Sequence, residues 1–465
     1  MPSRPRTQYV CQQCGRTAAR ELGRCPQCGA WNSMVGEAVA PAKARRVAGA
    51  AAGARTPRRL AEIEGDAEAR LALPIEEFSR VLGGGIVPAS VVLVGGEPGI
   101  GKSTLLLQVA VQMAHQGPVL YVSGEESERQ IKARAQRLFG TQGLPGDLFL
   151  LSETDMDAIV QHLETLHPVL AVIDSIQTVY LPEVESSAGS ITQVRDCAAR
   201  LQAVAKAGGC AIFLVGHVTK EGAIAGPRVL EHIVDTVLYL EGDPFHAYRL
   251  LRSVKNRFGA TSEVGVFEMG AGGMTEVLNP SEAFLAERVV NAPGSAIAVT
   301  MEGTRPLLVE IQGLTSPTSF GHPRRTGNGV DLNRLLLTIA VLTRRVGLKL
   351  AEQDAFVNVV GGLRIEEPAA DLAIAAAIAS SYWDRPLPAD TVLIGEVGLS
   401  GELRAVGQLP ARLREAARLG FRRAILPSST RLERGGAEGL AAIEARSVRE
   451  ALSLVLPSGR SAVTE

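Results

Sequence analysis

GEPGIGKS, residues 96–103, follows the apolar run VVLVG and precedes the helical run TLLLQVAVQMAHQ. The segment satisfies the pattern GxxxxGK[ST] in the strand-loop-helix context that a phosphate-binding loop requires. Glycines let such a loop curl so that backbone N–H groups surround phosphates, and the helix N-terminus adds its positive dipole end. We expect Lys102 to reach the β- and γ-phosphates of ATP, and Ser103 to ligate Mg²⁺. The predicted nucleotide-binding residues are Gly96, Glu97, Pro98, Gly99, Ile100, Gly101, Lys102, Ser103 and Thr104.

Acidic residues that follow two other apolar runs complete the predicted nucleotide site. Asp174 ends the run VLAVI, where a carboxylate can hold the magnesium shell at the carboxyl edge of a parallel sheet. Glu125 and Glu126 follow the run VLYVSG, so one of them can orient or deprotonate the attacking water. The sequence leaves open which of the two glutamates does so.

Short apolar runs alternate with longer helical ones from Ile75 onward, and this pattern sets the fold class. The runs are VVLVGG, PVLYVSGEE, VLAVIDS and CAIFLVGH. Strands buried on both faces read as continuous apolar runs, so the pattern predicts an α/β fold with a parallel sheet. Further along, AADLAIAAAIASS at 369–381 predicts a buried helix.

Four cysteines near the N-terminus form two CxxC pairs, Cys11 with Cys14 and Cys25 with Cys28, separated by ten residues. Two such turns can present four thiolates to one Zn²⁺, and a unit of ~30 residues has little core without the metal. The alternative is a disulfide or redox site, which a reducing cytosol and the lack of a thioredoxin-like βαβ unit disfavour. The spacing therefore predicts a zinc ribbon, whereas Cys197 and Cys210 are expected to be buried hydrophobes without chemistry.

Composition and charge indicate a globular protein with one basic segment. At 465 residues, with 46% hydrophobic and 21% charged residues, the chain can form two or three folded units. Residues 1–59 hold eleven Lys/Arg and two acids, a net +9, against −1 for the whole chain. No signal sequence and no apolar run near ~18 residues is present, so we expect a cytoplasmic protein.

Several motifs, in this order along nearly the whole chain, resemble the bacterial RadA (Sms) family. They are the four-cysteine motif, GEPGIGKST, YVSGEES, GHVTKEG, and KNRFG at 255–259. The resemblance implies a RecA-like P-loop ATPase core that assembles as a hexameric ring around DNA. It also implies that Lys255 and Arg257 act on the phosphates of a neighbouring subunit, where a cation supplied across an interface stabilises transition-state charge.

The loops that would face the pore of such a ring are PEVESSAGSITQVR and HVTKEGAIAGPR, at residues 182–195 and 217–228. Arg195, Lys220 and Arg228 are the candidate DNA contacts. Because neither loop holds an aromatic residue for base stacking, we expect contacts with the phosphate backbone and no sequence readout.

The chain from about Asp331 resembles the proteolytic domain of Lon, including the stretch LIGEVGLSGELRAVGQLPARLREA. Lon-type proteases use a serine activated by a lysine. The serine position falls near Ala370 or Asp371 and the lysine position at Pro410, so neither group is present. The expected divisions are a zinc finger at 1–35, a basic flexible linker at 36–60, an ATPase core at 61–315, a linker at 316–330, and a proteolytically inactive α+β domain at 331–465.

These features together predict a DNA-dependent ATPase of recombinational repair, a helicase-like motor that promotes strand exchange and branch migration with ATP, Mg²⁺ and Zn²⁺. The expected partners are single-stranded and branched DNA, a RecA-type recombinase and further copies of the chain, with no membrane. One alternative is an ATP-dependent protease, which the missing serine and lysine argue against. Another is a nucleotide-gated signalling or scaffold protein of the KaiC-like kind, which ATP hydrolysis unchanged by DNA would favour.

Overall fold

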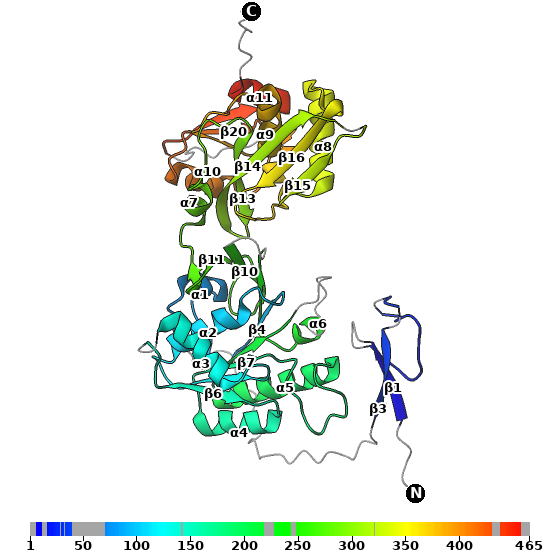
Figure 1. Cartoon of the computed structure of the whole chain (residues 1–465), viewed down its shortest axis with the longest axis vertical. Coiled ribbons are helices and arrows are strands. Elements are labelled where there is room, and N and C mark those ends of the chain that lie inside the picture. The colour runs from blue at the N-terminus through cyan, green and yellow to red at the C-terminus, as the bar shows by residue number, and fades with distance from the viewer. Residues whose placement is uncertain are drawn as a thin grey trace, which may run out of the picture. The chain divides into compact units, whose positions relative to one another are not determined.

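The computed structural model describes residues 6–11, 16–27, 29–31, 33–39, 70–140, 143–217, 227–242, 248–319, 321–429 and 438–456. The chain divides into two compact units, one of residues 1–244 with 249–276 and the other of residues 245–248 with 277–465. Figure 1 shows the helices and strands of each unit. No helix among these residues is long and apolar enough to cross a membrane.

A small antiparallel sheet with strand order β2-β1-β3 forms the N-terminal ribbon. Its strands are β1 (Arg6–Cys11), β2 (Thr17–Ala18) and β3 (Met34–Val39). Strand β3 runs past the expected end of the zinc finger at residue 35, because Gly36 pairs with Tyr9 and Val39 with Arg6. The rest of the expected linker, 40–60, lies outside the described residues.

A nine-stranded sheet with the order β12-β11-β10-β9-β4-β8-β7-β5-β6 is the centre of the ATPase core. Strands β4 to β9 run parallel, and β10 returns antiparallel to β9. The strands are β4 (Val91–Gly96), β5 (Val119–Ser123), β6 (Leu148–Ser152), β7 (Leu170–Asp174), β8 (Ala211–Val215), β9 (Thr236–Glu241), β10 (Tyr248–Asn256), β11 (Val264–Gly270) and β12 (Gly273–Glu276). The predicted parallel α/β core is therefore present.

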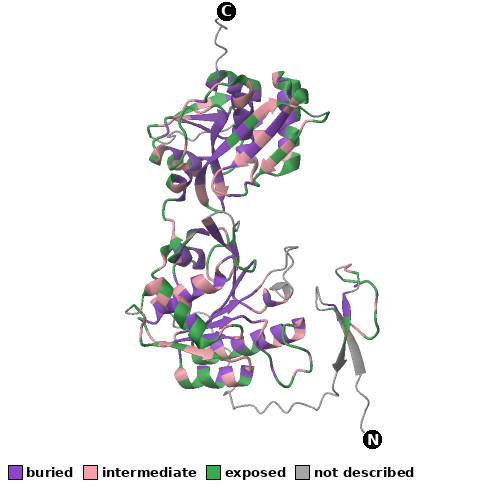
Figure 2. Cartoon of the chain, in the orientation of Figure 1, coloured by how far each residue is buried: buried purple, intermediate pink, exposed green. Residues whose placement is uncertain are grey.

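Helices cover both faces of this sheet, so each central strand is buried on both sides. Along β4, Val92 and Val94 join one apolar cluster with α2, and Val91 and Leu93 join another with α4 and α5. This alternation explains why the strand reads as an unbroken apolar run. Figure 2 shows the buried residues concentrated along the central strands. The helices are α1 (Glu76–Leu82), α2 (Lys102–Met113), α3 (Glu128–Phe139), α4 (Met156–Leu166), α5 (Ile191–Gly208) and α6 (Pro227–Leu230).

The C-terminal unit is built on a seven-stranded mixed sheet with the order β15-β16-β14-β13-β17-β20-β21, beside a hairpin of β18 and β19. Its strands are β13 (Ser295–Glu302), β14 (Arg305–Pro317), β15 (Arg325–Asn328), β16 (Gln353–Val359), β17 (Thr391–Leu393), β18 (Glu396–Val397), β19 (Leu403–Arg404), β20 (Arg423–Pro427) and β21 (Ala441–Ala445). Its α-helices are α7 (Pro280–Leu285), α8 (Leu332–Val341), α9 (Asp371–Trp383), α10 (Leu409–Arg418) and α11 (Val448–Val455). Short π and 3₁₀ turns span Leu342–Val346, Leu350–Glu352 and Pro368–Ala370.

Helix α9 is the predicted buried helix, and every residue from Asp371 to Ser380 is buried. It packs closely on β14 because Gly313 has no side chain there. A Cβ atom at Gly313 would lie 2.7 Å from the carbonyl carbon of Ala377. The small residues of α9 and this glycine thus set the distance between helix and sheet.

The expected domain boundary at 316–330 differs from the structure. Strand β14 continues to Pro317, and β15 pairs in parallel with β16 from Arg325 to Asn328. The division between the two units falls instead at Val277. The Pro, Gly and Arg residues that suggested a linker are compatible with an edge strand, since such a strand pairs on one side only.

Candidate nucleotide-binding site

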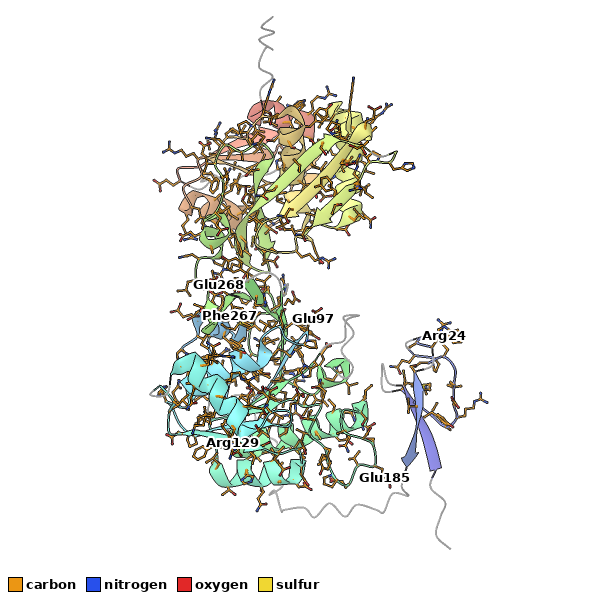
Figure 3. The ribbon with its side chains drawn as sticks, in the orientation of Figure 1. Arg24, Glu97, Arg129, Glu185, Phe267 and Glu268 are labelled. Carbon is orange, nitrogen blue, oxygen red and sulfur yellow. The ribbon has the colours of Figure 1, made fainter. Side chains whose placement is uncertain are left out.

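The loop between β4 and α2 carries the predicted phosphate-binding segment. Gly96 ends β4 tightly against β9, where a Cβ atom would lie 2.5 Å from the carbonyl oxygen of Leu240. Helix α2 begins at Lys102 with no side-chain cap and no acidic residue in its first turn, so its first N–H groups face the loop. Glu97, labelled in Figure 3, is exposed on this loop. Uncapped N–H groups at a helix N-terminus fit an anionic phosphate ligand.

Lys102 is the buried cation of the loop, with 4% of its surface exposed. Its ammonium donates hydrogen bonds of 2.8 and 2.9 Å to the carbonyl oxygens of Gly96 and Glu97. Burial lowers the pKa of Lys102 to about 8, and the carboxylates of Asp174 and Glu125 oppose that shift. The carbonyl groups and these two carboxylates offset only part of the desolvation of this cation, and a bound phosphate would offset more of it.

Asp174 lies at the carboxyl end of β7, opposite Ser123 on β5. Its carboxylate is buried and accepts a hydrogen bond of 2.6 Å at Oδ2 from the hydroxyl of Tyr121. Burial and this carboxylate raise the pKa of Tyr121 well above its ordinary value. Together with the hydroxyl of Ser103 in the first turn of α2, Asp174 offers the hard oxygen ligands that Mg²⁺ prefers.

The two glutamates after β5 have different partners. Glu125 accepts a hydrogen bond of 2.9 Å from the hydroxyl of Ser175, the residue after Asp174. Glu126 is held by Arg134 of α3 in an ion pair of 2.7 Å. The geometry therefore turns Glu125 toward the nucleotide site and engages Glu126 with a helix.

His217, directly after β8, also contacts this site, with Nε2 3.4 Å from Oε1 of Glu125. Strand β8 lies between β4 and β7, so its carboxyl end is next to both the phosphate loop and Asp174. His217, Ser175 and Tyr121 are not among the site residues predicted from the sequence. A polar residue at the end of each apolar run was the available signal for His217 and Ser175, whereas Tyr121 lies inside its strand and gave none.

KNRFG lies at the amino-terminal end of the parallel strands, whereas the phosphate loop of the same chain follows the carboxyl end of β4. Asn256 pairs with Thr236, which pairs with Val92 near the start of β4, four residues before Gly96. Four strand residues span roughly 13 Å. The side chains of Lys255 and Arg257 are thus separated from the phosphates that their own chain would bind.

A network of hydrogen bonds holds the KNRFG turn in place. Lys255 donates to the carbonyl oxygens of Glu231 and, at 2.7 Å, Val234, and Arg257 forms a 3.2 Å ion pair with Asp235. Burial and the charge of the neighbouring Arg257 lower the pKa of Lys255. Two cations are therefore presented on a fixed turn at the edge of the core.

The predicted DNA contacts are only partly within the described residues. Arg195 is half exposed on α5 and pairs with Asp196 at 3.0 Å. Lys220 and the side chain of Arg228 lie outside the described residues. The first predicted loop is braced by Gln193, which is 1% exposed and donates to the carbonyl oxygens of Leu181, Val184 and Ser186.

The described residues include the first cysteine of each CxxC pair, Cys11 and Cys25. Cys11 and Cys25 are buried in one small cluster with Met34. Their backbone N–H groups donate to the carbonyl oxygens of Arg16 and Ala30, each five residues ahead, so the two turns repeat one geometry. Cys14 and Cys28 lie outside the described residues. Two buried thiols on matching turns fit the soft ligand set of Zn²⁺.

The positions that correspond to the serine and lysine of a Lon-type protease are filled differently. Ala370 is fully buried, Asp371 starts α9, and Pro410 lies in the first turn of α10. Nearby, the fully buried Arg412 forms an ion pair with Glu367. Neither the serine nor the lysine that a Lon-type protease uses is therefore found at these positions.

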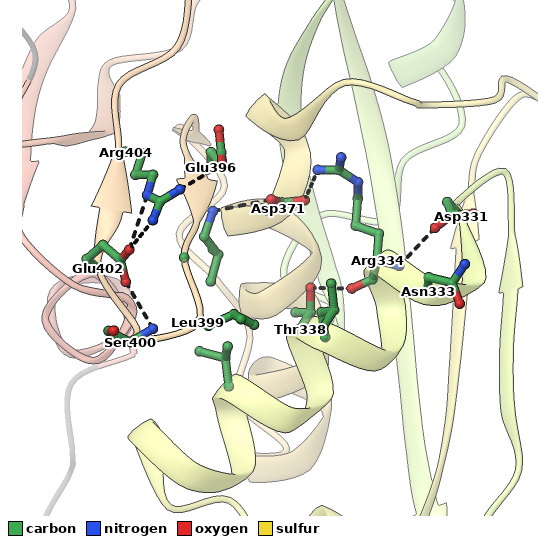
Figure 4. Close-up of a pocket in the computed structure, with 14 residues that line it drawn as sticks. Asp331, Asn333, Arg334, Thr338, Asp371, Glu396, Leu399, Ser400, Glu402 and Arg404 are labelled. Atoms are coloured by element: carbon green, nitrogen blue, oxygen red, sulfur yellow. Dashed lines mark hydrogen bonds and ion pairs between the residues drawn. The ribbon is translucent and has the colours of Figure 1, made fainter.

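A pocket of about 420 Å³ lies beside the start of α9 (Figure 4). Most of its charged side chains are paired with one another, while Asp331 accepts a hydrogen bond from the backbone N–H of Arg334. Arg334 contacts Asp371 at 2.8 Å, and Arg404 contacts Glu402 at 2.7 Å and Glu396 at 3.6 Å. Burial raises the pKa of Asp371, and the contact with Arg334 opposes that shift.

Sequence comparisons match the three parts of the chain separately. Residues 47–223 match the family described as AAA domain, and residues 9–36 match the rubredoxin metal binding domain. Residues 338–430 match the family of subunit ChlI of Mg-chelatase. The predicted fold class is confirmed: an α/β RecA-like P-loop ATPase core with an N-terminal zinc ribbon and a C-terminal α+β domain.

Relatives match the chain over nearly its whole length. The DNA repair protein RadA of Bacillus subtilis (strain 168) is 51% identical over 455 residues, which cover 97% of this chain and 98% of the relative. The protein of the same name from Halalkalibacterium halodurans is 52% identical over 429 residues, or 91% and 93% of the two chains. That from Listeria monocytogenes is 50% identical over 455 residues, or 97% and 98%.

Proposed function

Because this chain belongs to the family of the DNA repair protein RadA and has an AAA ATPase domain, we propose that it is a DNA-dependent, ring-forming ATPase. In this proposal it is a helicase-like motor that extends strand exchange and branch migration of recombination intermediates. The observation that carries the proposal is the separation of KNRFG from the phosphate loop of its own chain. If a second subunit completes each ATP site, Lys255 and Arg257 would serve the site of the neighbouring subunit, which explains their distance from the phosphate loop of their own chain.

The charged side chains of the site each have a role in the proposed hydrolysis of ATP. Lys102 and the N–H groups of α2 would bind the phosphates, and Ser103 and Asp174 would hold Mg²⁺, which would neutralise phosphate charge. Glu125 accepts a proton from the water that attacks the γ-phosphate, and ADP leaves with the bond pair of the broken P–O bond. His217 and Ser175 hold the Glu125 carboxylate near that water.

Lys255 and Arg257 would stabilise the transition-state charge on the phosphates of the next subunit. Their fixed turn supports this role, since a preorganised cation needs no rearrangement when the reaction occurs. The arrangement requires a closed assembly in which each interface is the same, for which a homohexamer is our proposal. Hydrolysis would then depend on ring formation.

DNA would pass through the ring in contact with the two predicted loops. Arg195, Lys220 and Arg228 are the proposed phosphate contacts, on single-stranded and branched DNA alike. A RecA-type recombinase is the proposed protein partner, because the strand-exchange intermediates on which the motor acts are products of such a protein. In the ribbon, Cys11, Cys14, Cys25 and Cys28 are the proposed Zn²⁺ ligands.

The C-terminal unit is proposed to be a scaffold without proteolytic activity. The buried Arg412–Glu367 pair near the lost serine and lysine positions supports this. Degradation of casein in the presence of ATP tests the alternative of an ATP-dependent protease, and we expect none.

Steady-state ATP hydrolysis with and without single-stranded DNA tests the proposal, using the native chain, Lys102→Ala and Lys255→Ala. We expect DNA to stimulate the native protein and both variants to lose the stimulated rate, with Lys255→Ala still binding ATP. Hydrolysis that is the same with and without DNA would reject the motor and favour a nucleotide-gated signalling protein.

A further inference from the structure

Trp31 in the N-terminal ribbon is 72% exposed, although it is a large apolar side chain. The small core of the ribbon consists of Cys11, Cys25 and Met34, with partly buried neighbours, and does not include this ring. Scattered exposed apolar residues are normal on a protein surface, so exposure alone says little. What distinguishes Trp31 is the way in which its ring is held.

Arg24 fixes the orientation of the Trp31 ring. The two residues form an antiparallel bridge, and the guanidinium carbon of Arg24 lies 5.6 Å from the ring centroid, a cation–π geometry. Nε of Arg24 donates a hydrogen bond of 2.9 Å to the carbonyl oxygen of Gly29, which anchors the guanidinium. Figure 3 labels Arg24 on the ribbon. The ring is thus preorganised while most of it stays open to solvent, so little entropy is lost when a ligand stacks on it.

The charge of the ribbon and of the sequence that includes it indicates the kind of ligand. Arg24 contacts the ring, Arg16 and Arg20 are exposed elsewhere on the same ribbon, and the sequence of residues 1–59 carries a net charge of +9. A flat aromatic ring on a cationic segment matches a polyanion whose bases are also flat and aromatic. Base stacking on an aromatic side chain tolerates any base, because every base has a π face.

We propose that Trp31 is a stacking site for a base of single-stranded DNA, with Arg24 and the other exposed arginines of the ribbon, Arg16 and Arg20, contacting the phosphate backbone. This inference rests on the proposed action on DNA and adds a contact outside the pore loops. A protein partner with an acidic surface is the competing occupant, and the test distinguishes the two.

The chain offers a direct probe, because it has two tryptophans, Trp31 and Trp383. In the full-length Trp383→Phe protein, Trp31 is the single source of tryptophan fluorescence. This protein is titrated with an oligodeoxythymidylate without nucleotide, and stacking predicts that the Trp31 emission is quenched as DNA binds. The affinity for the same oligonucleotide is then measured for Trp31→Ala, Trp31→Phe and Val35→Ala.

We expect Trp31→Ala to bind the oligonucleotide about tenfold more weakly, within the range that loss of one stacked base costs. Trp31→Phe should keep most of the affinity, since it retains an aromatic face. Val35→Ala, at a residue that is 48% exposed on β3, is the matched control and should bind like the parent. Equal zinc content in all four proteins shows that the ribbon is intact.

Unquenched emission together with equal affinity of Trp31→Ala and parent would overturn the inference and leave the proposed function standing. Absence of DNA binding in every protein, the parent included, would instead reject the proposed function. Emission that changes only when a RecA-type recombinase is added would also overturn the inference, in favour of a protein-binding surface. If Trp31→Ala loses zinc, its affinity is not used. Quenching of the Trp31 emission by DNA, together with an affinity of Trp31→Phe close to that of the parent, then supports stacking, and unquenched emission overturns it.

Discussion

The hydroxyl of Tyr121 donates a hydrogen bond of 2.6 Å to Oδ2 of Asp174, and both side chains are buried. Tyr121 lies on β5 and Asp174 ends the adjacent strand β7. One carboxylate oxygen therefore accepts from a neutral donor, and the carboxylate would be oriented for the proposed magnesium shell. Orientation of a metal-binding carboxylate by such a partner is a common feature of metal sites.

Substitution of Tyr121 by phenylalanine removes this hydrogen bond and keeps the packing. Because a hydrogen bond to a charged group contributes about 1.5–3 kcal/mol, Asp174 should become less well oriented. We expect the MgCl₂ concentration that half-saturates binding of a fluorescent ATP analogue to rise at least severalfold, about 3- to 10-fold. Tyr180→Phe, at a partly exposed tyrosine, is the control. An unchanged magnesium requirement in Tyr121→Phe would show that the tyrosine is only a packing residue.

Glu125 and Glu126 should respond differently to the same conservative change. Glu125→Gln removes the proposed base, so kcat should fall by about 10²-fold or more while ATP binding is retained. Glu126→Gln changes only the contact with Arg134 of α3 and should keep kcat within about threefold, since the pair is partly exposed. DNA-stimulated hydrolysis and binding of a fluorescent ATP analogue measure both quantities. The opposite order of the two variants would assign the base to Glu126.

The buried ion pair of Arg412 and Glu367 should be important for the stability of the C-terminal unit. Arg412 is 1% exposed, and Glu367 also accepts a hydrogen bond of 2.7 Å from the backbone N–H of Met301. Arg412→Met leaves the Glu367 carboxylate without its counterion, and because this carboxylate is 27% exposed the cost should be about 3 kcal/mol, the lower end of the range for a buried pair. We expect a calorimetric transition about 10 °C lower, by the usual scaling for a unit of this size.

The control for Arg412 is Arg404→Ala, because Arg404 is 58% exposed in its own ion pairs. Such a surface pair contributes about 0–1 kcal/mol, so its transition should move little. Adding Glu367→Gln to Arg412→Met should recover part of the lost stability, since it removes the unpaired charge. Equal transitions for Arg412→Met and Arg404→Ala would contradict this interpretation.

Local motifs made the ATP site predictable from the sequence. The phosphate loop and the position of Asp174 follow from an apolar strand, a short motif and a helix that are contiguous in the chain. The choice between Glu125 and Glu126 was not predictable, because the two are adjacent and their partners, Ser175 and Arg134, come from other elements. Tyr121 was missed because a tyrosine inside a strand looks like any other core residue.

The predicted linker at 316–330 differs from the structure for a related reason. Apolar alternation reflects a buried face, and no residue of β15 is fully buried, so RTGN at 325–328 looked like a loop. Its strand character depends on pairing with β16, about 30 residues later in the chain. The buried helix α9, whose signal is local, was predicted correctly.

In the proposed ring, KNRFG of one subunit completes the ATP site of the next, and mixing two inactive variants shows whether it does. Lys102→Ala lacks the phosphate-binding lysine and keeps KNRFG, whereas Lys255→Ala keeps the phosphate loop and lacks the finger lysine. In an equal mixture with random assembly, about a quarter of the interfaces combine both intact halves. We predict that DNA-stimulated hydrolysis returns in the mixture to about that fraction of the native rate, and a mixture as inactive as its two components would contradict the claim.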